Sequence, residues 1–173
     1  MRSKFVIASC LTVLMALSPL SALANPPSGG FGPAIEGWTG YDGQEKCSPW
    51  AKPGVLAFRS MVLRAYPGTG AGGISRACNV GGQSEHKEGR AWDWTVNVSV
   101  PYQKAAAESL IDWLTDEDRY GNEAAMAKRL GIMYLIWNRK IWGAWGGWST
   151  YCVPKPRGCV DPDDGGLRHP HTD

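Results

Sequence analysis

The sequence predicts a single domain that combines helices with a few strands. Segments 53–65 and 101–115 carry apolar residues at helical spacing, as surface helices with one buried stripe do. Segment 132–137 is apolar on both alternations, which is typical of a central strand buried on each face. Segment 91–98 alternates between apolar and polar residues, as a half-buried strand does. Together these patterns predict a mixed architecture of helices and sheet.

Residues 1–24 are predicted to form a secretory signal peptide. Two basic residues precede an apolar run from Phe5 to Leu20, and Ala22-Leu23-Ala24 fits the small-x-small pattern of a cleavage site. The mature chain is then expected to begin at Asn25 and to be secreted into an extracellular compartment. A lipoprotein signal at Cys10 is the alternative, but only a handful of apolar residues precede that cysteine.

Removal of this leader changes the charge of the chain. The 173 residues include 18 Lys and Arg against 16 Asp and Glu, and two of the basic residues but none of the acidic ones lie in the leader. The remaining chain is balanced, so the basic isoelectric point does not predict a nucleic-acid partner. No second apolar run is long enough to span a bilayer, and about 149 residues suit one domain. We expect a monomer that has no membrane contact after signal removal.

The mature chain is predicted to begin with an arm that leads into a helix. Residues 25–50 are rich in Gly, Pro and Trp without a sustained period, so we expect an arm that becomes ordered only by docking onto the domain of residues 51–173. Pro53 opens the helix, and Tyr66-Pro67-Gly68 stops it. The glycine-rich run 68–73 is predicted to be a surface loop, because no strand precedes it and no Gly-Lys-Ser/Thr follows.

Four cysteines remain after the leader, and an even number in an exported chain favours disulfides. Three pairings exist. We favour Cys47–Cys78, which would tie the arm to the run-up of the motif described below, and Cys152–Cys159, which would close a short loop. A zinc site made of the four cysteines is the rival interpretation, although the sequence has no Cys-x-x-Cys pair.

Segment 74–78 is a short strand candidate that contains Arg76. The planar guanidinium of Arg76 would suit a substrate carboxylate. A solvated surface charge is the alternative, and it is the more common fate of a single Arg. Both interpretations stay open on the residues alone.

Two further helices are predicted in the second half of the chain. Helix 101–115 is followed by the acidic run 116–118, which is typical of a solvated helix end. The next helix is expected to run from an Asn122 cap through Leu130, and Gly131 is expected to end it.

A hairpin and a tryptophan cluster follow these helices. Strand 132–137 leads through a turn at 138–140 into Ile141-Trp142. The cluster consists of Trp142, Trp145 and Trp148, interleaved with glycines. Such a cluster either closes the core of a small domain, which is its more common role, or stacks on sugar rings.

The stretch from Ser84 to Trp94 concentrates the residues that carry chemistry. On one continuous helix, His86 and Asp93 would lie roughly 10 Å apart along the axis, too far to bind one metal ion. We therefore predict that the chain folds back between them at Gly89, which can adopt backbone angles that a side chain forbids. Asp93 would then lie on the polar face of the strand that follows, where a cleft is expected.

The pattern Ser84-x-His86-x-x-Gly89-x-Ala91-x-Asp93 resembles the signature of the D-alanyl-D-alanine carboxypeptidase and hedgehog-like zinc peptidase superfamily. The longer context resembles a secreted branch of it, on the Cys47 region, Arg76-Ala77-Cys78, the Trp-rich hairpin and Pro170-His171-Thr172-Asp173. This resemblance implies an α+β domain with a small antiparallel sheet flanked by helices. It also implies a hydrolase that acts on peptidoglycan peptides of the cell wall.

The resemblance assigns roles to five residues. It implies that His86 and Asp93 bind Zn2+ and that Ser84 supports them from behind. It implies that Arg76, in a catalytic role, and Gln83 lie near the substrate. The alternative is that His86 is an ordinary surface or core histidine and that Asp93 is a turn residue.

The superfamily also needs a third ligand, from a His-x-His or Glu-x-x-His element of its final strand. The sequence has no Glu-x-x-His, and His169-Pro170-His171 contains a proline, which removes a strand hydrogen bond. In the secreted branch the run Pro-His-Thr-Asp continues into a His-x-His pair. We therefore expect the domain to lack its final strand, its third ligand and its catalytic base. Whether His171 or residues beyond Asp173 supply the ligand stays open, as does the activity of the chain.

Three classes of function follow from these observations. The first is an exported zinc-dependent peptidase that acts on cell-wall peptides. The second is a non-catalytic wall-binding module on the same fold, and the third is an exported structural or interaction domain in which the motif is incidental. The residues specify neither the bond that is cleaved nor the stereochemistry of the substrate.

Overall fold

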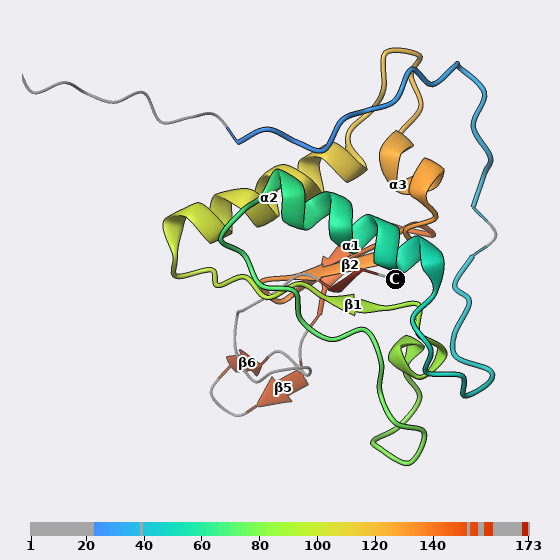
Figure 1. Cartoon of the computed structure of the whole chain (residues 1–173), viewed down its shortest axis with the longest axis vertical. Coiled ribbons are helices and arrows are strands. Elements are labelled where there is room, and N and C mark those ends of the chain that lie inside the picture. The colour runs from blue at the N-terminus through green and yellow to red at the C-terminus, as the bar shows by residue number, and fades with distance from the viewer. Residues whose placement is uncertain (1–22, 39, 152, 156–157, 161–170, 173) are drawn as a thin grey trace, which may run out of the picture.

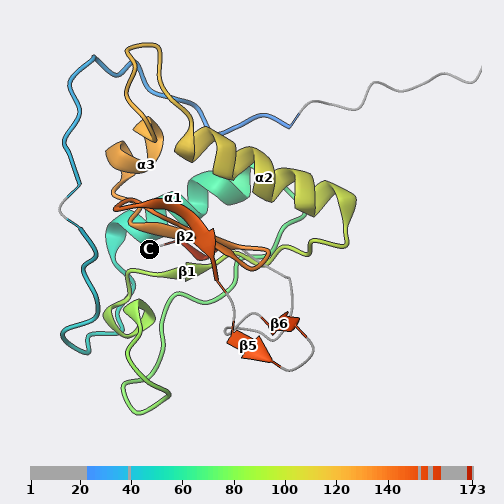
Figure 2. The same ribbon diagram turned by 180° about the vertical axis from the view of Figure 1, so that it is seen from behind.

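A computed structural model describes residues 23–38, 40–151, 153–155, 158–160 and 171–172. Within these ranges the chain is an α+β domain, in which helices pack against a small antiparallel sheet (Figures 1 and 2). The coarse class implied by the resemblance is therefore confirmed. Most of the predicted signal peptide, together with Cys152 and His169, lies outside the described residues.

Two helices have the bounds that the sequence predicts. Helix α1 spans Pro53–Ala65, and helix α2 spans Pro101–Thr115. Each begins with proline in its first turn, where the missing N–H removes no intrahelical hydrogen bond. Their buried side chains, which join the core under the sheet, include Phe58, Val62, Leu110 and Leu114. In the described part of the chain, none of the helices has the length and apolar character needed to cross a membrane.

The third helix is shorter than predicted. Helix α3 spans Ala125–Leu130, and its N-cap is Ala124, not Asn122. The Asn122 amide instead donates to Asp118 Oδ2 and to the Pro33 carbonyl, both at 3.1 Å. Asparagine forms such loop contacts as readily as helix caps, so the predicted start of this helix was wrong. Gly131 ends the helix at φ 67°, as predicted.

The main sheet has the strand order β1-β7-β2-β3-β4, and its described pairs are antiparallel. Its strands are β1 (Trp92–Asp93), β2 (Tyr134–Trp137), β3 (Lys140–Gly143), β4 (Gly147–Thr150) and β7 (His171–Thr172). A separate pair is formed by β5 (Val153–Lys155) and β6 (Gly158–Val160). This pair projects from the side of the sheet that faces away from α2 (Figures 1 and 2).

Strands β2 and β3 form the predicted hairpin, with a tighter turn than expected. The turn consists of Asn138 and Arg139, because Lys140 already belongs to β3. Their φ angles are 48° and 64°. Two successive positive φ angles are typical of the two-residue turn whose twist matches that of the flanking strands.

Several strand predictions differ from the structure. Segment 74–78 contains no strand, and of segment 91–98 only β1 and a single bridge between Thr95 and Gly70 remain. Strand β4 was not predicted, since its glycine-rich surroundings hide any alternation. Strand β7 follows Pro170, which had argued against a strand at this point.

The sheet places Asp93 on the face opposite to the core. Residues directly opposite each other in antiparallel strands share a face. Trp92, Leu135 and Trp142 belong to one such row and contribute to the core with α1 and α2. The adjacent row contains Asp93 and Ile136, so Asp93 lies on the face away from that core.

The arm has no helix or strand among its described residues and follows the outside of the domain (Figure 1). The Ser28 hydroxyl accepts a hydrogen bond from Trp113 Nε1 at 2.9 Å. Trp38 packs edge-on against Trp142, with ring centroids 6.1 Å apart. The Ser48 N–H donates to the Lys87 carbonyl at 2.7 Å. The arm is therefore held in place by the domain and not by regular structure of its own.

The predicted disulfide between Cys47 and Cys78 is present, with Cα atoms 5.8 Å apart. It joins the end of the arm to the loop that precedes the motif. The second predicted bond, Cys152–Cys159, includes a residue outside the described ranges.

Candidate metal centre

The chain folds back within the motif at the predicted glycine. Residues Glu85–Glu88 form a short 3-10 helix, η1, and Gly89 follows it at φ 67°. A Cβ atom at position 89 would lie only 2.0 Å from the Trp50 carbonyl oxygen. Glycine is therefore required twice, for the left-handed backbone and for the close approach of residue 50. The prediction of a reversal at Gly89 is confirmed.

This reversal brings the imidazole of His86 to the carboxylate of Asp93. His86 Nε2 and Asp93 Oδ1 lie 3.2 Å apart. Two donors on one tetrahedral zinc ion, each roughly 2.0–2.2 Å from the metal, are separated by about 3.3–3.6 Å. The pair is therefore within a few tenths of an ångström of two adjacent positions on one ion. The His86 side chain is 7% exposed and that of Asp93 is 30% exposed, whereas the facing atoms Nε2 and Oδ1 are themselves buried.

The orientation of the imidazole is set by a backbone carbonyl. His86 Nδ1 lies 2.9 Å from the carbonyl oxygen of Ile74, which can only accept a hydrogen bond. Nδ1 therefore donates this hydrogen bond, and Nε2 is the ring atom that faces Asp93. Histidines that bind metals commonly donate their second ring N–H to a carbonyl or carboxylate in this way.

The glycine-rich run places Ile74 beside the motif. The Asp93 N–H donates to the Gly73 carbonyl at 2.8 Å, and the Arg76 N–H donates to the His86 carbonyl at 3.1 Å. Gly72 has φ 48°, and a Cβ atom there would lie 1.5 Å from the Asp93 carbonyl oxygen. Most of the run is exposed, as the prediction of a surface loop requires, but its backbone also packs against the candidate site.

The other residues predicted for the site have backbone contacts with it or with the arm. Gln83 Nε2 donates to the Gln44 carbonyl at 2.7 Å, and the Ser84 N–H donates to Gln44 Oε1 at 2.8 Å. Among the hydrogen bonds described for this structure, none joins the Ser84 hydroxyl or the Arg76 guanidinium to the His–Asp pair. The supporting role of Ser84 and the substrate roles of Gln83 and Arg76 stay predictions.

Sequence reasoning missed Glu85, which lies at the centre of a buried polar cluster. Glu85 is 6% exposed. Its Oε1 accepts a hydrogen bond from the Tyr41 hydroxyl at 2.7 Å, and its Oε2 accepts one from the Tyr134 hydroxyl at 3.0 Å. Arg90 Nη2 lies 3.9 Å from Oε1. The two tyrosines are 44 and 49 positions away from Glu85 in the chain, so no local sequence pattern predicts the cluster.

Glu88 fastens η1 to the arm. Arg90 Nε donates to Glu88 Oε2 at 2.8 Å, and the N–H groups of Glu45 and Lys46 donate to Oε1 at 3.2 and 3.0 Å. The hydrogen bond from Arg90 is the main reason why the pKa of Glu88 lies below its usual value. Burial opposes this shift, and the hydrogen bonds from the N–H groups of Lys46 and Glu45 add to it. The carboxylate is thus held ionised as a structural clamp.

The third donor is not among the described side chains. In the part of the chain that the structure describes, no group of three or more His, Cys, Asp or Glu residues is arranged to hold a metal ion. The backbone of His171 is nevertheless paired directly opposite Asp93 in β1 and β7. Residue 171 thus occupies the strand position beside the candidate site.

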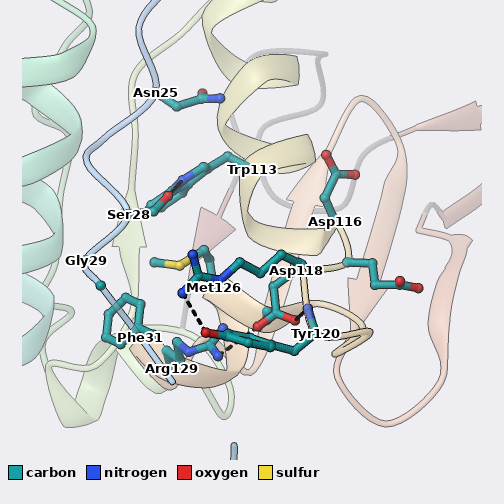
Figure 3. Close-up of a pocket in the computed structure, with 14 residues that line it drawn as sticks. Asn25, Ser28, Gly29, Phe31, Trp113, Asp116, Asp118, Tyr120, Met126 and Arg129 are labelled. Carbon is teal, nitrogen blue, oxygen red and sulfur yellow. Dashed lines mark hydrogen bonds and ion pairs between the residues drawn. The ribbon is translucent and has the colours of Figure 1, made fainter. Parts of the chain in front are cut away.

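A cavity of about 500 Å³ lies elsewhere, between the arm and the ends of α2 and α3 (Figure 3). Trp113 and Ser28 meet at one wall. At another wall Arg129 forms an ion pair with Asp118 at 2.8 Å and lies over the Phe31 ring, 5.0 Å from its centroid. None of the lining residues belongs to the motif. We assign the cavity to docking of the arm.

The Asp118 carboxylate beside this cavity is strongly stabilised in its ionised form. Burial by itself would raise its pKa. The side chain and N–H of Asn122, the N–H of Tyr120 and the guanidinium of Arg129 donate hydrogen bonds that together hold the pKa far below its usual value.

Residues 47–169 match the family model described as VldE, C-terminal domain. The chain belongs to this family. The matched region begins at the disulfide residue Cys47 and includes α1, the motif and the hairpin of this VldE C-terminal domain. No curated protein and no solved structure matches the chain. The family description names no metal, substrate or reaction.

Proposed function

We propose that this chain is an exported zinc-dependent peptidase domain that acts on cell-wall peptides. The observation that carries the proposal is the 3.2 Å separation of His86 Nε2 and Asp93 Oδ1, on a chain reversal that admits only glycine. The resemblance of the Ser84–Asp93 pattern to the zinc peptidase signature supplies the substrate class.

The donors and their support suit zinc. Imidazole nitrogen and carboxylate oxygen are common zinc ligands, and the Ile74 carbonyl keeps His86 Nε2 directed at the site. When bound, zinc supplies Lewis-acid polarisation of a carbonyl group and a nucleophilic water at neutral pH. Because the Asp93 side chain is partly exposed, we expect a substrate to approach from its side.

His171 is our candidate for a third ligand from this chain. Its backbone is paired directly with that of Asp93, and opposite residues of an antiparallel pair share a face of the sheet. Two donors from β1 and β7, together with His86, would complete the three protein ligands that catalytic zinc sites use.

Arg76 is our candidate for binding a substrate carboxylate. Arg76 lies two positions after Ile74, and its N–H donates a hydrogen bond to the His86 carbonyl. The backbone of Arg76 is therefore next to that of a candidate metal donor. A terminal carboxylate of a wall peptide is the group that a planar guanidinium binds best.

A non-catalytic wall-binding module is the second candidate. The half-exposed side chains of Trp145 and Tyr41 favour this possibility, because they offer a binding surface that requires no metal. Hydrolysis of a wall peptide distinguishes the two candidates, because only the peptidase cleaves it.

Metal analysis of the purified chain tests the proposal. We expect one zinc per chain in the wild type, and loss of that zinc in His86→Ala and in Asp93→Ala. Asp116→Ala, which removes an acidic residue at the end of α2, is the control and should retain zinc. Circular dichroism should show that the variants stay folded, because the Cys47–Cys78 disulfide and the core under the sheet are unchanged.

Undiminished zinc in both site variants would refute the metal centre. Loss of zinc in His171→Ala would support the third ligand, and retention there would reject it. Mass spectrometry of stem peptides, incubated with and without a chelator, then decides between the candidates. Chelator-sensitive cleavage supports the peptidase, whereas zinc binding without cleavage supports the wall-binding module.

A further inference from the structure

Three aromatic side chains from distant parts of the chain form a cluster beside Glu85, which we call the aromatic triad: Tyr41, Tyr134 and Trp145. The Trp145 ring lies edge-on to that of Tyr41, with centroids 5.2 Å apart, and edge-on to that of Tyr134, with centroids 6.4 Å apart. The two tyrosine rings are also 6.4 Å apart. Each member of the triad therefore contacts both others.

The indole of Trp145 packs directly against Gly143. A Cβ atom at Gly143 would lie 2.7 Å from Trp145 Cε2 and Cζ2, so the indole covers the position where a side chain would be. Gly143 lies directly opposite Tyr134 in the β2–β3 pair. Tyr134 is two positions before Ile136, which belongs to the same row as Asp93. Side chains two positions apart on a strand share a face, so Tyr134 and Gly143 lie on the face of Asp93. The triad thus lies on the same face of the sheet as Asp93.

The two tyrosines of the triad are anchored, although part of the triad is exposed. Both tyrosine hydroxyls donate hydrogen bonds to the buried carboxylate of Glu85. Trp145 is nevertheless 47% exposed and Tyr41 is 56% exposed. Beyond Trp145 the chain continues with Gly146 and Gly147, around which added Cβ atoms would meet nothing within 4 Å. Positions 146 and 147 therefore place no side chain over the neighbouring indole.

We propose that the exposed face of Trp145 binds a sugar ring of the cell-wall glycan. The exposed area of the Trp145 side chain is roughly 100 Å². This area is well below the about 800 Å² that each partner of a stable protein complex buries. It is comparable to the face of one sugar ring. The flat face of an indole suits the C–H face of a pyranose ring. The inference rests on the proposed wall function for the source of the sugar, but it does not depend on the metal.

Titration with a peptide-free oligosaccharide of N-acetylglucosamine tests this inference, with chelator present throughout. Calorimetry and the indole N–H signal of Trp145 in NMR spectra report binding. We expect saturable binding by the wild type and an affinity at least about tenfold lower for Trp145→Ala. Trp148→Ala is the matched control, since Trp148 is 45% exposed but belongs to the row of Trp142 on the other face of the sheet. It should bind within about twofold of the wild type.

A second variant pair keeps the ring and moves it. Gly143→Ala should weaken glycan binding, because the new methyl group displaces the indole, whereas Gly146→Ala should not. Absence of binding by the wild type, or equal affinities of Trp145→Ala and the wild type, would overturn the inference. The inference would also be overturned if Trp145→Ala weakened binding of a glycan-free stem peptide as much as it weakens binding of the glycan. Glycan binding by a chain that takes up no zinc would leave this inference standing and reject the peptidase proposal.

Discussion

Replacement of Gly89 by alanine tests the chain reversal on which the candidate site is built. Two separate effects are expected. The first is the left-handed backbone at φ 67°, which an alanine adopts at a cost of about 1–2 kcal/mol. The second is the overlap of the new Cβ atom with the Trp50 carbonyl oxygen, 2.0 Å away. Because this neighbour is backbone, it cannot rotate aside, and the forced shift should cost about 1–3 kcal/mol more.

Gly131 offers a control that isolates the first effect. It ends α3 with the same φ of 67°, but a Cβ atom there would meet nothing within 4 Å. Gly131→Ala should therefore lose only the backbone contribution. The difference between the two variants measures the overlap and should be about 1–3 kcal/mol.

Urea denaturation followed by tryptophan fluorescence measures both free energies of unfolding. Zinc titration adds a second readout, since displacement of η1 moves His86 away from Asp93. We expect weaker zinc binding in Gly89→Ala and unchanged binding in Gly131→Ala. Equal destabilisation of the two variants would refute the close approach of residues 50 and 89, and with it our reason for the reversal.

Two further predictions concern stability. Cys47→Ser opens a loop of 31 residues and should lower the free energy of unfolding by about 3.5 kcal/mol in the chain-entropy model, measured as a shift of the urea midpoint; an unchanged midpoint would contradict the disulfide. Asp118→Asn should destabilise the domain at pH 7 and flatten its acid unfolding, because a carboxylate with a lowered folded-state pKa contributes stability above its unfolded pKa of about 3.9 that is lost as the pH falls. Asp116→Asn should retain the wild-type dependence on pH, and parallel curves for the two variants would argue against the Arg129–Asp118 pair.

Local features of this chain were predicted from the sequence because they depend on near neighbours. Pro53 and Pro101 mark the first turns of α1 and α2, and the apolar stripes that follow specify which side is buried. The spacing of His86 and Asp93 predicted a reversal, and the conformational freedom of glycine placed it at Gly89. The start of α3 was missed, because an asparagine that can cap a helix can equally bond to an acidic loop residue.

The tertiary structure decided what surrounds these features. Pairing of distant segments puts the Ile74 carbonyl on His86, the hydroxyls of Tyr41 and Tyr134 on Glu85, and the backbone of His171 beside Asp93. None of these partners is set by periodicity or by turn chemistry, since each depends on how separate segments meet. The sequence by itself thus determined where the chain turns and which two residues are candidate metal donors, whereas only packing determined how these residues are oriented and what lies next to them.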